Sequence, residues 1–184
     1  MAESIWKSTL AEFRDKLASR DPVPAGVSVA AVSASLALNL LIKVLEISRQ
    51  RRDFQGDATK IEELVASARA ESKKLEHYAE EDITAFAEYM ASRRTPQEAA
   101  ALGRAIEIPL AAARAAASGL KLCADAVGTT PASIAPDLGT ATLLLASSIR
   151  AMLLSVESNA LRSTDPQFRD DVARAVESIG KSTT

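Results

Sequence analysis

A single row of apolar side chains extends along the middle of the chain and constrains the fold more than any other feature. Its members recur at steps of three and four residues: Ile61, Leu64, Ala68, Leu75, Tyr78, Ala79, Phe86 and Met90. That spacing places them on one face of a long α-helix. A helix of this length is stable only when its apolar face packs against other long helices. The sequence therefore predicts an all-α fold, a bundle of about five long antiparallel helices plus a short terminal helix.

Composition agrees with a helical bundle. Hydrophobic residues make up 47% of the chain and aromatic residues only 4%, so the apolar content is mostly Ala, Leu, Val and Ile, which favours closely packed helices over sheets. The 184 residues are the length of one domain, predicted to span residues 1–184. A formal net charge of −2 provides neither a basic surface for nucleic acid nor a polybasic membrane patch.

Start and stop signals divide the chain into predicted helices. A short helix over residues 4–18 is followed by a connector from Asp21 to Gly26, and Ser28 is placed to cap the next helix. Thr59 with Glu62, and Thr95 with Pro96 and Glu98, form capping-box patterns. The remaining predicted helices cover residues 29–51, 59–92, 96–127 with Pro109 inside, a helix from Asp137 or Gly139 to 161, and a short stretch from Pro166.

Two apolar runs, residues 27–42 and 138–156, raise the possibility of membrane spans. The first carries three serines and Asn39, and the second is interrupted by Arg150, so neither matches the ~20 clean apolar residues of a span. We interpret both as buried bundle helices. The N-terminus has no basic segment followed by an apolar stretch, and the protein is expected to be cytoplasmic.

Few residues are available for metal or nucleophile chemistry. Cys123 is the only cysteine and His77 the only histidine, which excludes an intrachain disulfide and a Cys/His zinc site. His77 lies away from the apolar row and is predicted at the surface. No metal and no cofactor are expected.

Asp82 is the candidate catalytic residue. The residues three and four positions away are Tyr78, Ala79, Ala85 and Phe86, all on the buried row, so this carboxylate is predicted to point inward. Burial raises the pKa of an acid toward neutrality and makes a general acid or base. A structural role, in which Asp82 caps a helix or pairs with an arginine, is the alternative. Glu80 and Glu81 are predicted on the solvated face.

Three arginines, Arg49, Arg51 and Arg52, end the helix over residues 29–51. Cations at a helix C-terminus stabilise the helix dipole whatever the function. Guanidinium groups also bind carboxylates and phosphates in a bidentate manner, so these residues are candidates for binding an anionic ligand.

Five short motifs occur in an order that resembles a known family. The segment Pro22 to Ala31 is similar to the Pro-x-Pro-Gly-Gly-Gly-Ser-Val-Ala-Ala opening of the formimidoyltetrahydrofolate cyclodeaminase and methenyltetrahydrofolate cyclohydrolase family. The other four resemblances are Glu81–Phe86 to Glu-Asp-x-x-Ala-Phe, Ile108–Leu110 to Val-Pro-Leu, Asp137–Gly139 to Asp-x-Gly, and Asp165–Phe168 to Asp-Pro-x-Phe.

The resemblance implies an all-helical homodimer with a folate site near the subunit interface. It further implies either loss of ammonia from a formimino group on ring closure or addition of water to a methenyl bridge. Asp82 would be the general acid/base, and the other candidate binding residues are Gly26, Ser28, Arg51, Arg52, Asp137 and Asn159.

Three departures from the family pattern support an alternative function. Ala25-Gly26-Val27 replaces a glycine triplet, Gly128 to Pro131 replaces a Gly-Asn-x-Asn loop, and Ser155 to Asn159 keeps one asparagine of two. Bare backbone lets a ligand approach closely, and amides both donate and accept hydrogen bonds, so these changes bear on ligand binding. The alternative is an inactive or re-purposed family member that binds a ligand or a protein.

Overall fold

The computed structural model describes residues 4–52, 54 and 56–181, and within them every regular element is helical. Two 3-10 turns, η1 (Ile5–Lys7) and η2 (Val127–Thr129), accompany the α-helices. The α-helices are α1 (Leu10–Leu17), α2 (Gly26–Gln50), α3 (Ala58–Ser92), α4 (Glu98–Ala126), α5 (Ala135–Ala160) and α6 (Pro166–Gly180). The predicted all-α bundle is confirmed.

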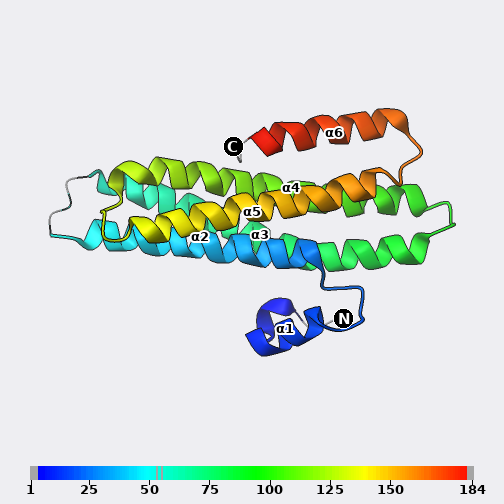
Figure 1. Cartoon of the computed structure of the whole chain (residues 1–184), viewed down its shortest axis with the longest axis horizontal. Coiled ribbons are helices and arrows are strands. Elements are labelled where there is room, and N and C mark those ends of the chain that lie inside the picture. Colours follow the sequence, from blue (N-terminus) through cyan, green and yellow to red (C-terminus); the bar gives the residue numbers. More distant parts are fainter. Residues whose placement is uncertain (1–3, 53, 55, 182–184) are drawn as a thin grey trace.

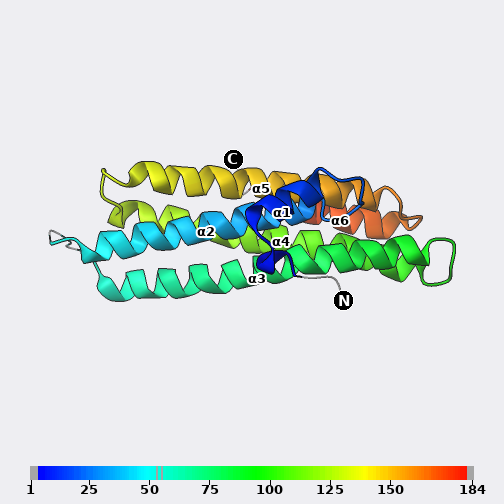
Figure 2. The ribbon, with the colours of Figure 1, turned by 90° about the horizontal axis from the view of Figure 1, so that it is seen from below.

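Four long helices form the body of the molecule, as Figure 1 shows. Helices α2 to α5 run antiparallel, and each packs along its neighbour in the order α2, α3, α4, α5 and back to α2. Helix α6 packs mainly on α5, whereas α1 lies outside the bundle on the side away from α6 (Figures 1 and 2). Helix α1 has no buried residue.

The N-terminal turn before α1 is attached to the middle of α3. Ile5 is buried, and the Ser4 hydroxyl donates to a Glu80 carboxylate oxygen. The Trp6 indole Nε1 donates to the Glu76 backbone carbonyl at 2.9 Å. These contacts hold residues 4–7 on the bundle although the helix that follows them is largely exposed.

Several helix starts differ from those predicted. Helix α2 begins at Gly26 after the N-cap Ala25, so Ser28 lies inside the first turn and does not cap it. Asp57, not Thr59, caps α3 and accepts from the amides of Thr59 and Lys60. Both corrections have one cause: when several capping side chains lie within a few residues, the spacing alone does not decide which one is used. The predicted Asp165 start of α6 is confirmed.

The start of α4 is also later than predicted. Its first residue is Glu98, so Pro96 precedes the helix. The Glu98 carboxylate accepts from the Arg94 amide at 2.6 Å, and Arg94 adopts a positive φ of 64°. The Glu98 side chain therefore accepts from a backbone amide, as in a capping box, but the amide belongs to a tight turn ahead of the helix.

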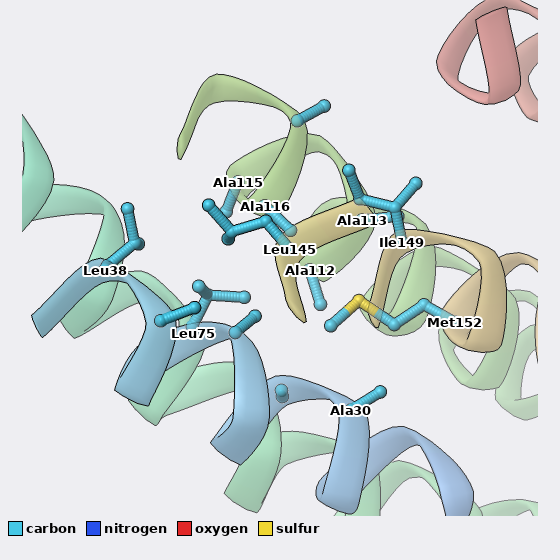
Figure 3. Packing of buried hydrophobic residues seen from close by; sticks show 14 of the residues in the cluster. Ala30, Leu38, Leu75, Ala112, Ala113, Ala115, Ala116, Leu145, Ile149 and Met152 are labelled. Atoms are coloured by element: carbon cyan, nitrogen blue, oxygen red, sulfur yellow. The ribbon is translucent and has the colours of Figure 1, made fainter. Parts of the chain in front are cut away.

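The core consists of leucines and isoleucines set against the alanines of α4 (Figure 3). Ala112, Ala113 and Ala116 are fully buried opposite larger side chains such as Leu145 and Ile149. Gly119 leaves room for two core leucines: a Cβ there would come within 2.7 Å of Leu38 Cδ2 and 3.3 Å of Leu145 Cδ2. Small residues on α4 thus allow all four helices to share one core.

Helix α2 is a corner of the bundle, not the central helix that its nearly continuous apolar sequence suggests. Its outer side leaves Val29 (37%), Leu36 (55%) and Ile47 (38%) exposed. Helices α2 and α5 are both long and apolar enough to cross a membrane by length and composition, which the count of clean apolar residues did not anticipate. Because both pack lengthwise in the four-helix core, that criterion is weak support for a membrane span.

Candidate functional site

Asp82 lies where α3 passes the first turn of α2. The Ser28 hydroxyl, which is fully buried, donates to Asp82 Oδ2 at 3.5 Å. Ala79 and Ala85, on either side of Asp82 along α3, are also fully buried. The carboxylate is itself half-buried. Its predicted inward orientation therefore agrees with the structure, and Ser28 is its hydrogen-bond partner.

The surroundings of Asp82 change its acidity. Burial raises the pKa of the carboxyl from 3.8 to about 6, and the hydrogen bond from Ser28 acts in the opposite direction by lowering it. Burial is the larger effect because a single weak hydrogen bond replaces the water that would solvate the anion. A carboxyl group with this pKa exchanges its proton near neutral pH, as a general acid or base requires.

The first turn of α2 is open beside this pair. Ala25 provides no capping side chain, and the Gly26 backbone is exposed. A Cβ built on Gly26 meets no atom within 4 Å, so the protein itself leaves that space empty. Val27 is 5% exposed and lies on the buried side of the turn, while Ala25 lies at the surface. Unsatisfied amides at a helix start attract polar or anionic groups of a ligand.

The two glutamates that precede Asp82 are half-buried, which corrects their predicted position on the solvated face. Glu80 accepts from Ser4, as described above, and Glu81 pairs with Arg104 of α4 at 2.6 Å. Arg104 also pairs with Glu88 at 2.8 Å. Long side chains bend back to form these contacts although their Cα atoms lie off the buried row. His77 is exposed, as predicted.

Asn159 has a structural partner at the same end of the bundle. Its Nδ2 donates to the Ala105 carbonyl of α4 at 3.1 Å. In an α-helix that carbonyl would accept from residue 109, but Pro109 has no amide hydrogen. Asn159 therefore supplies the donor that Pro109 removes and ties α5 to α4. Its Oδ1 and the second Nδ2 hydrogen are left for a ligand.

The other predicted binding residues lie at the opposite end of α2. Arg51 and Arg52 follow the last turn of α2, separated from Ser28 by about 34 Å of helix. Arg51 Nη1 donates to Ser133 Oγ at 3.3 Å, and Asp137 is in the first turn of α5 nearby. A cavity of about 360 Å³ between Arg51, Phe54 and the Gly128 to Pro131 loop lies at this end. The structure therefore does not bring Arg51, Arg52 or Asp137 to Asp82 within one chain.

A second polar cluster between α2 and α3 has no counterpart among the predicted site residues. Asn39 Nδ2 donates to Ser72 Oγ at 2.9 Å, and Ser72 contacts Ser35 at 3.0 Å and Glu76 at 3.4 Å. The serines and the asparagine within the apolar run of α2 were the available signal, because polar side chains there need partners. Within the described ranges, no three His, Cys, Asp or Glu side chains converge as metal ligands.

Comparison with known proteins places this geometry in a family. The family model for formiminotransferase-cyclodeaminase matches residues 9–178. The methenyltetrahydrofolate cyclohydrolase of Methylorubrum extorquens is 23% identical over 183 aligned positions, which cover 93% of this chain and 88% of that protein. The crystal structure of formiminotetrahydrofolate cyclodeaminase from Thermotoga maritima superposes with a TM-score of 0.92 at 22% identity, covering 97% of this chain and 91% of that one.

At these identities the two relatives support the fold but not a shared reaction. The family model, however, spans nearly the whole sequence, including the Pro22 to Ser28 connector, Asp82 and most of α6. The chain therefore belongs to the formiminotransferase-cyclodeaminase family.

Proposed function

We propose that the protein is a cytoplasmic, homodimeric enzyme that acts on the one-carbon unit of a tetrahydrofolate derivative, with Asp82 as its general acid/base. The observation that carries the proposal is the half-buried Asp82 carboxyl, with a pKa of about 6, hydrogen-bonded to Ser28 beside the open first turn of α2. The named reactions of the two relatives support the substrate class. No metal or cofactor takes part in this proposal.

Two reactions suit such a site. In the cyclohydrolase reaction, water adds to the methenyl carbon, one carbon–nitrogen bond opens, and the carboxylate accepts the proton of the attacking water. In the cyclodeaminase reaction, a ring-closing nitrogen attacks the formimino carbon, and the carboxyl group transfers a proton to the departing ammonia. Each requires one group that both accepts and donates a proton. At pH 7.5 a carboxyl with a pKa of about 6 is mostly ionised and accepts first.

The residues around Asp82 have separate roles in this proposal. The Gly26 backbone and the free amides of the first turn bind polar edges of the pterin, because the space beside Gly26 is empty. Ser28 orients the carboxylate through its hydrogen bond. Asn159 contributes through Oδ1 and its second Nδ2 hydrogen, since the Ala105 carbonyl accepts only one of the two amide hydrogens.

The decisive experiment measures loss of methenyltetrahydrofolate absorbance and, separately, release of ammonia from formiminotetrahydrofolate. Purified protein is expected to accelerate one of the two above the spontaneous rate. Asp82→Asn should reduce that rate by about 10²–10⁴-fold, the contribution typical of a general acid or base. Glu63→Gln, an exposed carboxylate on the same helix, is the matched control and should retain full activity.

Inactivity of the wild-type protein in both assays, combined with no folate binding by calorimetry, would reject the enzyme. Folate binding without turnover would favour the alternative of an inactive family member, which the changed Gly128 to Pro131 loop supports.

A further inference from the structure

A cavity at one end of the bundle has no part in the site around Asp82. It has a volume of about 500 Å³ and lies between the α3–α4 turn and the α5–α6 turn, both of which are at the same end of the molecule (Figure 1). This volume is within the roughly 300–1,000 Å³ range of small-molecule sites. None of the candidate binding residues named above lines it, so a ligand held here is separate from the one proposed at Asp82.

The floor of this cavity is apolar. Leu102 of α4 is 6% exposed, and Phe168 of α6 is half-buried against the core. Gly103 also lines the cavity, and a Cβ built on it meets no atom within 4 Å. The chain therefore leaves open space over two large apolar side chains, which suits an apolar group of a ligand.

Arg162 provides a positive charge at the rim of the cavity. Its guanidinium lies over the Tyr89 ring, 5.8 Å from the ring centroid, and Tyr89 is only 5% exposed. The electrons of the ring face attract the cation and hold it in place. In the part of the chain that the structure describes, Arg162 forms no salt bridge with a carboxylate. Its donors are therefore open to a carboxylate that comes from outside the chain.

Two carboxylates line the same cavity, and each has one oxygen engaged by backbone amides. Glu98 Oε2 accepts from the Arg94 amide. Asp165 Oδ1 accepts from the amides of Gln167 and Phe168. Within residues 4–52, 54 and 56–181, neither carboxylate pairs with a lysine or arginine side chain. Glu98 Oε1 and Asp165 Oδ2 are thus available to accept from a cationic donor.

We propose that this cavity binds a free apolar α-amino acid. The carboxylate of the amino acid pairs with Arg162, and its ammonium group pairs with Glu98 and Asp165. Its side chain lies over Leu102 and Phe168. A simple anion would face two carboxylates and a simple cation would face a guanidinium, so a zwitterion is the class of ligand that matches both signs of charge.

Such a ligand joins two turns that are far apart in the sequence. Glu98 begins α4, whereas Arg162 follows the end of α5. A ligand that binds only the folded state raises the free energy of unfolding. Binding therefore stabilises this end of the bundle, and occupation of the cavity can be measured as a thermal shift without an activity assay.

Calorimetry with three matched probes tests the pairing of charges. L-phenylalanine carries both charges, phenylpropanoate lacks the ammonium group, and phenethylamine lacks the carboxylate. L-phenylalanine is expected to bind at millimolar concentration or below. Each analogue should bind about tenfold more weakly, because it leaves charged groups of the protein without a partner. The melting temperature should accordingly rise most with L-phenylalanine.

Substitutions at the rim distinguish the two ends of the ligand. Arg162→Gln should weaken L-phenylalanine binding about tenfold without weakening that of phenethylamine. A variant with Glu98→Gln and Asp165→Asn keeps the bonds to backbone amides, because amide oxygens also accept. It should weaken L-phenylalanine binding without weakening that of phenylpropanoate. Arg169→Gln, at an exposed arginine that lines a different cavity, is the matched control and should bind like wild type.

A variant with a filled cavity separates binding from folding. Gly103 lies inside α4, where leucine has a higher helix propensity than glycine. Gly103→Leu should therefore keep or raise the melting temperature of the free protein and abolish its stabilisation by L-phenylalanine. Loss of binding in this folded variant cannot come from unfolding.

Four results would overturn the proposal. They are no heat and no thermal shift with L-phenylalanine at millimolar concentration, phenylpropanoate or phenethylamine binding as tightly as L-phenylalanine, equal affinity in wild type and Arg162→Gln, or unchanged binding in Gly103→Leu. None of these measurements uses turnover, so their outcome is independent of the reaction proposed at Asp82.

Discussion

The two ends of α2 differ in what they offer to a ligand. At the start of the helix, Ser28 is fully buried and holds a half-buried carboxyl whose pKa is raised to about 6. At the other end, Arg51 and Arg52 are exposed beside a polar cavity of about 360 Å³. About 34 Å of helix separates them. One end therefore holds a carboxyl that titrates near neutral pH, and the other holds exposed guanidinium groups beside a cavity.

Two residues on the same helix do not necessarily line the same pocket. Residues on one helix share a site only when they lie within a turn or two of each other, whereas Asp82 and Ser28 are close although 54 positions separate them.

The largest effect is expected from substitutions that change the two ends of α2 in separate variants. Replacing both Arg51 and Arg52 by alanine should raise KM at least about tenfold by removing charge-assisted hydrogen bonds, with kcat little changed. Asp82→Asn should instead reduce kcat. An unchanged KM in the double arginine variant would show that this end of α2 does not bind the substrate.

The second prediction concerns the α4–α5 contact near the Asp82 end. Asn159→Ala should lower the free energy of unfolding by about 1–3 kcal/mol, because it leaves the buried Ala105 carbonyl without a donor. In a Pro109→Ala background, residue 109 regains an amide hydrogen and the cost of Asn159→Ala should nearly vanish. Urea unfolding of the four proteins measures this coupling. An equal cost in both backgrounds would show that Asn159 acts otherwise.

The third prediction concerns pH. The pKa of Asp82 is higher in the folded protein, at about 6, than its ordinary value of 3.8, so the folded state binds this proton more tightly. Its contribution to stability is therefore lost as the pH rises from about 4 to about 6, and amounts to about 3 kcal/mol. Asp82→Asn lacks this loss and should gain stability relative to wild type between pH 4 and pH 7.5. If the free energies of unfolding of the two proteins differed by the same amount at every pH in that range, the prediction would be wrong.

The smallest effect is expected at Ser28. Its hydrogen bond lowers the pKa of Asp82, so Ser28→Ala should raise that pKa further. The fall in activity on the acidic side should shift to higher pH, while activity at pH 8.5 stays close to wild type. Ser33→Ala, which removes another α2 hydroxyl away from Asp82, is the control and should leave the profile unchanged.

Helical periodicity was sufficient to predict the bundle and the inward orientation of Asp82, because both depend on residues within one or two turns. The partner of Asp82 was beyond this reasoning, since the position of Ser28 against α3 depends on how two helices align. Asn159 shows the same limit. Pro109, placed inside a predicted helix, has no amide hydrogen to donate, but only the packed structure shows that the Ala105 carbonyl faces Asn159.

The indole of Trp6, held by the Glu76 carbonyl, makes the protein its own optical probe. It is the only tryptophan in the chain, so all indole emission originates from the N-terminal turn. Glu76 and Asp82 are about 9 Å apart along α3. Emission therefore reports on detachment of residues 4–7 or arrival of a ligand near Asp82, whereas circular dichroism follows the bundle. The two signals distinguish local opening from global unfolding in one sample.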